Sequence, residues 1–121
     1  MQKTIYVVDD SDTNLLKAED ALEDDYRVMT LPSASKMFAL LDKVPPDLIL
    51  LDIEMPEMDG FAALSLLKAD PAYADIPVIF LTGTKDESIE ARGFQLGAVD
   101  FVLKPFSQQG LLDRIESNLA P

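Results

Sequence analysis

The stretch DLILLD, residues 47–52, combines an unbroken apolar centre with a carboxylate at its last position. Consecutive apolar residues without polar alternation are typical of a strand covered on both faces, as in a parallel sheet that has helices on each side. The loop that follows contains Pro56 and the pair Asp59-Gly60, which are turn signals. The stretch therefore predicts a central buried strand that ends on Asp52.

Apolar runs alternate with helical patterns in both directions from this stretch. The runs predict four further strands, at residues 3–8, 26–31, 76–82 and 98–104. Apolar residues at helical spacing predict five helices, at residues 12–25, 34–43, 61–70, 86–97 and 107–120. Ser11 or Asp12 is the expected N-cap of the first helix, and Gly93 is an unfavourable residue inside the fourth. Five βα units without repeats or linkers predict one α/β domain over residues 1–121, with a doubly wound, five-stranded parallel sheet.

Net charge restricts the partners of the chain. It has 10 basic and 22 acidic residues and a formal charge of −12. Such a charge repels phosphates, so we expect no direct nucleic acid binding and no binding to anionic membranes. No apolar run approaches the ~18 residues of a membrane-spanning helix, and the N-terminus lacks a signal-peptide pattern. We expect a cytoplasmic protein.

The absence of two residue types restricts the chemistry. The chain has no cysteine and no histidine. A Ser-His-Asp triad, a thiolate nucleophile and a soft-metal site are therefore excluded. Any bound metal must be a hard ion that is held by oxygen atoms, such as Mg²⁺.

Polar side chains gather where the predicted strands end. The first strand is followed by Asp9 and Asp10, the third ends on Asp52, the fourth on Thr82 and the fifth on Lys104. Because the carboxyl ends of parallel strands meet at one edge, these side chains should converge where the strand order reverses. Three carboxylates would form a hard-cation site, and the metal and the lysine would neutralise an arriving phosphate. The aspartate that ends the central strand is the best candidate for a nucleophile that forms an aspartyl phosphate.

Four segments, VVDDSD, LILLDIEMPEMDG, IFLTG and GAVDFVLKPF, resemble in order and spacing the receiver domain of two-component response regulators. The resemblance covers essentially the whole chain. It implies a flavodoxin-like (βα)₅ fold, like that of the chemotaxis response regulator, with strand order 2-1-3-4-5. It also implies a domain that accepts a phosphoryl group from a sensor histidine kinase or a histidine phosphotransfer protein. Such a domain is not an enzyme for other substrates, because it catalyses only its own phosphorylation and dephosphorylation.

The resemblance implies a role for each acidic residue. Asp52 would be the phosphoacceptor and a metal ligand. Asp10 would bind Mg²⁺, or Mn²⁺ as a substitute, directly, whereas Asp9 would act mainly through a coordinated water. The backbone carbonyl of Glu54 would complete the protein's share of the metal shell. The Glu54 side chain and Thr84 would flank the phosphate and affect dephosphorylation.

The resemblance also implies a switch. Lys104 would pair with the phosphoryl group, and the Lys104–Pro105 peptide bond would be cis. Thr82 would move towards the phosphate, and Phe101, the switch aromatic, could then turn inward. This motion would alter the face made by the fourth helix, the fifth strand and the fifth helix, through which an output partner or a second copy could bind. Because Phe101 has no hydroxyl group, its two positions would differ by packing.

Three alternative functions fit the sequence to different degrees. A haloacid dehalogenase-type phosphatase would place its nucleophile in DSDTN, residues 10–14, but the last position of that motif does not match, and Asp52 would be unexplained. A flavodoxin-like FMN carrier needs its phosphate loop after the first strand, where this chain is acidic. A receiver-like scaffold that works without phosphorylation is the main alternative, although none of the required residues is missing. The output domain and process, the cognate kinase, the oligomeric state and the choice between a stand-alone and an excised receiver stay open.

Overall fold

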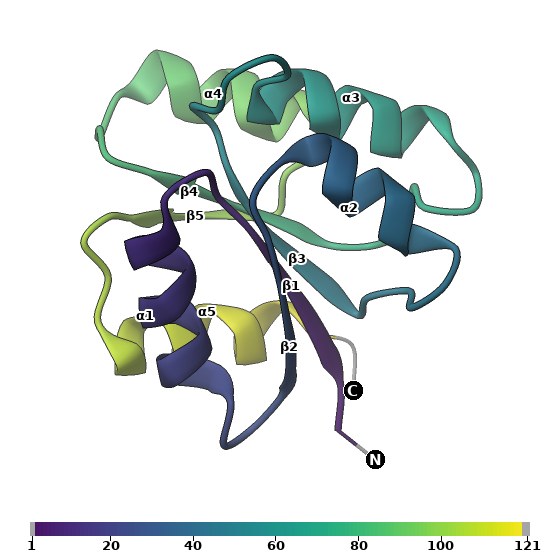
Figure 1. Cartoon of the computed structure of the whole chain (residues 1–121). Helices are drawn as coiled ribbons and strands as arrows, with labels where there is room; N and C mark the ends of the chain where they lie inside the picture. Colours follow the sequence, from purple (N-terminus) through teal and green to yellow (C-terminus); the bar gives the residue numbers. More distant parts are fainter. Residues whose placement is uncertain (1, 120–121) are drawn as a thin grey trace.

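The computed structural model describes residues 2–119 as a single sheet covered by helices on both faces (Figure 1). The five strands are all parallel and lie in the order β2-β1-β3-β4-β5. The predicted fold class and strand order are confirmed. Helices α1 and α5 lie on one face of the sheet, and α2, α3 and α4 lie on the other.

The elements alternate strictly along the chain. The strands are β1 (Thr4–Val8), β2 (Arg27–Leu31), β3 (Leu48–Asp52), β4 (Val78–Thr82) and β5 (Asp100–Leu103). The helices are α1 (Asp12–Leu22), α2 (Ala34–Leu41), α3 (Gly60–Ala69), α4 (Glu87–Leu96) and α5 (Gln108–Asn118). Every predicted element is present, but most are shorter than predicted. The predicted end of the last helix, at residue 120, lies outside the described residues.

The helix ends have identifiable causes. The first helix was predicted to reach residue 25, which is wrong, because α1 ends at Leu22 and residues 23–25 form a turn. Those three residues are acidic, and carboxylates are unfavourable at the negative end of a helix. Ser11 is the N-cap of α1, since its side chain accepts a hydrogen bond from the Asn14 amide. Gly97 ends α4 in a left-handed conformation, with φ 114°.

Alternating residues of the strands build two cores. All residues of β1, β3 and β4 are buried. Ile5 and Val7 of β1 face α1 and α5, whereas Tyr6 and Val8 face the opposite core. Strands that are apolar on both sides require helices on both faces of the sheet. The sequence pattern of DLILLD and its neighbours therefore produces the three-layer arrangement.

One close approach shapes the loop after β3. The amide of Gly60 donates a hydrogen bond of 2.7 Å to the Ile53 carbonyl. A Cβ atom at Gly60 would lie 2.5 Å from the backbone oxygen of Asp52. Only a glycine allows α3 to begin this close to the end of β3. This contact holds the loop against the backbone of Asp52.

Candidate functional site

The acidic residues and the lysine meet at the carboxyl edge of the sheet. Asp9 and Asp10 follow β1, Asp52 ends β3, and Lys104 follows β5. The Lys104 ammonium group lies 3.0 Å from Asp52 Oδ1 and 3.5 Å from Asp9 Oδ2. The three aspartates each offer an oxygen atom within 4.8 Å of the others. Residues separated by up to 95 positions in the chain therefore form one cluster.

A small cleft opens above this cluster. Its volume is about 230 Å³. The residues that line it come from the loops after β1, β3, β4 and β5 and from the start of α1: Asp9, Asp10, Ser11, Asn14, Asp52, Ile53, Glu54, Thr82, Gly83, Thr84 and Lys104. Every charged or hydroxyl residue expected at the strand ends thus lies in the wall of this cleft. A larger hollow, which shares Thr82 with this cleft, contains none of the three aspartates.

Burial sets the electrostatics of the cluster. Asp9 is completely buried and Asp52 is 3% exposed, whereas Asp10 is exposed. Burial raises the pKa of Asp52 from 3.8 to about 6, and the charge of Asp9 adds to the rise, although the Lys104 hydrogen bond opposes it. Burial by itself lowers the pKa of Lys104, but the hydrogen bonds and charges of Asp52 and Asp9 outweigh burial and raise it. The cluster is therefore short of positive charge when all three carboxylates are ionised.

The donor atoms suit a hard divalent cation. The cluster offers carboxylate oxygens from two buried residues and one exposed residue, and Glu54 lies in the same cleft. The exposed position of Asp10 leaves one side open to water, and Mg²⁺ usually retains several waters. One ammonium group faces three carboxylates, so a dication would balance the remaining charge. These features meet the requirements for binding Mg²⁺.

Of the two expected switch residues, Thr82 lines the cleft, whereas Phe101 on β5 does not. The Thr82 hydroxyl donates a hydrogen bond to the Thr84 carbonyl and accepts one from the Thr84 amide, both at 3.2 Å. The Phe101 ring is only 9% exposed and packs against Phe80, with the ring centres 5.5 Å apart. The Lys104–Pro105 bond, which the sequence analysis expects to be cis, is cis in the structure.

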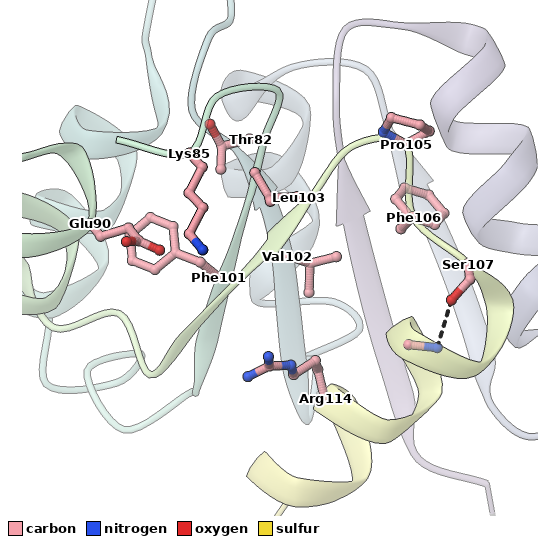
Figure 2. Close-up of a pocket in the computed structure, with 11 residues that line it drawn as sticks. Thr82, Lys85, Glu90, Phe101, Val102, Leu103, Pro105, Phe106, Ser107 and Arg114 are labelled. Atoms are coloured by element: carbon pink, nitrogen blue, oxygen red, sulfur yellow. Dashed lines mark hydrogen bonds between the residues drawn. The ribbon is translucent and has the colours of Figure 1, made fainter. Parts of the chain in front are cut away.

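A second hollow separates α4 from α5 across β5 (Figure 2). Its volume is about 410 Å³. Lys85 and Glu90 lie on one side of it, and Phe106 and Arg114 lie on the other. Phe101 also contributes to its wall, so a movement of this ring would change the shape of the hollow.

Four residues line the acidic cleft without having been expected there from the sequence: Ser11, Asn14, Gly83 and Ile53, which directly follows β3. Ser11 and Asn14 come from the start of α1, and Gly83 follows β4. Asn14 is half-buried and lies in the first turn of α1, the helix that begins shortly after Asp9 and Asp10. Its place in that first turn could have indicated Asn14, whereas Gly83 has no side chain to signal its position.

Comparison with known proteins agrees with this fold. The family model described as "Response regulator receiver domain" matches residues 5–116 of the chain. The chain therefore belongs to the receiver domain family of two-component response regulators, in which a phosphoacceptor role is the standard function.

Particular relatives support the family from both sequence and structure. A Vibrio cholerae protein named "Probable cyclic di-GMP phosphodiesterase" is 42% identical over 98% of this chain and 27% of its own length. Response regulator PleD of Caulobacter vibrioides is 36% identical over 97% of this chain and 26% of its own length. The structure of Vibrio cholerae chemotaxis protein CheY4 superposes with a TM-score of 0.94 at 27% identity, covering 98% of this chain and all of that one.

The relatives differ from this chain in extent. The chain spans about a quarter of the length of the first two relatives, so their named activities belong to larger proteins. The phosphodiesterase name describes that relative and gives no activity for residues 1–121. Within residues 2–119, no helix has the length and apolar character needed to cross a membrane.

Proposed function

We propose that residues 1–121 form one receiver domain in which the Asp52 carboxylate accepts the phosphoryl group. The observation that carries this proposal is the hydrogen bond of 3.0 Å from Lys104 to Asp52 at the base of the acidic cleft. A carboxylate at the end of a rigid, fully buried strand presents its oxygen in a fixed direction. The other side of that carboxylate borders the open cleft, where a phosphoryl donor can approach.

The surrounding residues would divide the remaining tasks. Asp10 and Asp52, the Glu54 carbonyl and, mainly through a water, Asp9 would hold Mg²⁺, or Mn²⁺ in its place. The ion would supply positive charge for the phosphoryl oxygens. Lys104 already bridges Asp52 and Asp9 and would bind one phosphoryl oxygen. The domain would catalyse only its own phosphorylation and dephosphorylation.

Thr82 would couple phosphorylation of Asp52 to a change at the surface of the domain. Its hydroxyl would exchange its present bonds with Thr84 for a bond to a phosphoryl oxygen. The Thr84 loop leads directly into α4, so this exchange would alter the face made by α4, β5 and α5. An output partner or a second copy of the domain would bind that face.

The phosphoryl donor must come from outside residues 1–121. Because the chain has no histidine, we propose a sensor histidine kinase or a histidine phosphotransfer protein as the donor, acting in the cytoplasm. A small acyl phosphate would serve in its place in vitro. The charge of −12 argues against nucleic acid or anionic membrane as a direct partner of this domain.

Mass spectrometry tests the central assignment. The protein would be incubated with acetyl phosphate and Mg²⁺, and the modified residue would be located by peptide sequencing after borohydride trapping. We expect a label on Asp52 and none in Asp52→Asn, while Asp75→Asn, a change at an exposed aspartate, keeps the label. A label elsewhere would contradict the assignment of Asp52.

Binding of beryllofluoride in the presence of Mg²⁺ distinguishes a phosphorylation-dependent receiver from a scaffold that works without phosphorylation. A receiver that works by phosphorylation should bind this phosphate mimic at Asp52 and lose binding in Asp52→Asn. Failure of the wild type to bind it, together with a missing label, would favour a phosphorylation-independent scaffold. The phosphoryl lifetime of Glu54→Ala would then show whether that side chain affects dephosphorylation, and an unchanged lifetime would remove it from the account.

A further inference from the structure

Gly93 lies within α4, on the side of the helix that faces the Phe101 ring. It is the buried position of that helix. A Cβ atom placed on Gly93 would lie 2.4 Å from Cζ and 3.1 Å from Cε1 of Phe101, and 3.1 Å from Cδ2 of Phe80. Carbon atoms do not approach to 2.4 Å, because the optimal separation is about 3.5–4.0 Å. No residue with a side chain fits at this position while the Phe101 ring keeps its place.

Backbone conformation does not explain this glycine. The glycine with a positive φ is Gly97, the C-cap of α4, whereas Gly93 has no left-handed conformation that would require its type. Glycine is also among the poorest residues for a helix interior. The space occupied by the Phe101 ring is therefore the feature that requires glycine at 93.

The ring has a defined place under the helix. Phe101 packs at 5.5 Å from Phe80 and at 5.1 Å from Phe94, measured between ring centres. In the same structure the Thr82 hydroxyl bonds to the backbone of Thr84. The inward position of Phe101 thus depends on packing against its neighbours and on the space at Gly93, and it does not require a bond from Thr82.

We propose that Gly93 is a positioning residue that holds Phe101 in its inward place and thereby sets the shape of the face made by α4, β5 and α5. A methyl group at 93 would push the ring towards the hollow between α4 and α5, whose wall Phe101 already shares. The effect of this displacement on signalling rests on the proposed function, whereas the packing does not.

Fluorine NMR of the protein labelled with fluorophenylalanine tests the packing. The chain has six phenylalanines, and Phe101→Leu would identify the signal of interest. In Gly93→Ala we expect that signal to shift and to become sensitive to a soluble paramagnetic probe, while the Phe106 signal changes little. Gln95→Ala, at an exposed position of the same helix, is the control and should leave the signal in place.

A double variant separates a clash from a general weakening of α4. If the added methyl group clashes with the Phe101 ring, Gly93→Ala should lower the melting temperature of the wild-type protein. In a Phe101→Leu background, the same change should leave the melting temperature unchanged or raise it. Equal losses in both backgrounds would overturn the proposal. An unmoved Phe101 signal in Gly93→Ala would overturn it as well.

Affinity for beryllofluoride with Mg²⁺ tests the consequence for signalling. We expect Gly93→Ala to bind the mimic at least about threefold more weakly than the wild type and Gln95→Ala, because a displaced ring disfavours the conformation that the mimic selects. An unchanged affinity would overturn the link between Gly93 and the switch. The NMR measurement needs no phosphate mimic, so a wild type that fails to bind beryllofluoride would count against the proposed function alone.

Discussion

Replacement of Asp52 by asparagine should stabilise the metal-free protein at neutral pH. The carboxylate is 3% exposed and lies beside the fully buried Asp9. Ionisation of Asp52 therefore costs free energy in the folded state. Asparagine has nearly the same shape, and its amide oxygen can still accept the hydrogen bond from Lys104. Asp52→Asn therefore removes the charge without opening a cavity.

The pKa of Asp52 gives the magnitude. A rise from 3.8 to about 6 corresponds to about 3 kcal/mol of preference for the neutral form in the folded state. Between these two values the folded state binds more protons than the unfolded state, so stability falls as the pH rises, and the full cost is present above pH 7. We expect Asp52→Asn to gain about 1–3 kcal/mol at pH 7.5, and much less at pH 4.5, where the wild-type carboxyl is largely protonated.

Urea denaturation in the presence of a chelator measures this gain. Unfolding curves of the wild type and Asp52→Asn at pH 4.5, 6.0 and 7.5 would give the difference at each pH. Asp75→Asn controls for the loss of one negative charge from a protein of charge −12. A gain that is equal at all three values, or that Asp75→Asn reproduces, would refute the argument from burial of Asp52.

Three further outcomes follow from the structure. Mg²⁺ at a concentration of tenfold its dissociation constant should stabilise the wild type by about 1.4 kcal/mol in a thermal melt, and Asp10→Asn should lose most of this gain. An equal gain in Asp10→Asn and the wild type would remove Asp10 from the metal site. Leu64→Ala, which leaves a cavity at a fully buried position of α3, should lower the free energy of unfolding by about 2–5 kcal/mol in urea denaturation. A loss below about 1 kcal/mol would mean that the core closes around the cavity. Glu57 has φ 69°, so Glu57→Gly should raise the free energy of unfolding by about 0.5–1 kcal/mol, and a decrease would show that the side chain stabilises the loop.

The sheet could be predicted from sequence because its strands are apolar throughout. DLILLD and IPVIFLT leave no polar face, so they require helices on both sides, and alternation with helical segments requires parallel strands. The grouping of Asp9, Asp52, Thr82 and Lys104 at one edge followed from that topology. The residue-level roles of these side chains stay predictions until the experiments above are done.

Other features depend on tertiary contacts that a sequence pattern does not carry. The sequence predicts Gly93 only as an unfavourable residue inside a helix, whereas the structure shows that its lack of a side chain makes room for Phe101. The raised pKa of Asp52 depends on how deeply the carboxyl is covered and on the distance to Lys104. The end of α1 at Leu22 was also missed, because the helical apolar pattern extended past the point where acidic residues stop the helix.

The bridge from Lys104 to Asp9 joins residues near the two ends of the chain. Asp9 and Asp52 can be brought together by the first half of the polypeptide, but their cationic partner arrives only when β5 has docked beside β4. A nascent or truncated polypeptide that lacks β5 would carry the acids without the ammonium group. Completion of this charged cluster therefore requires β5, so the last strand of the sheet contributes to the site as well as to the fold.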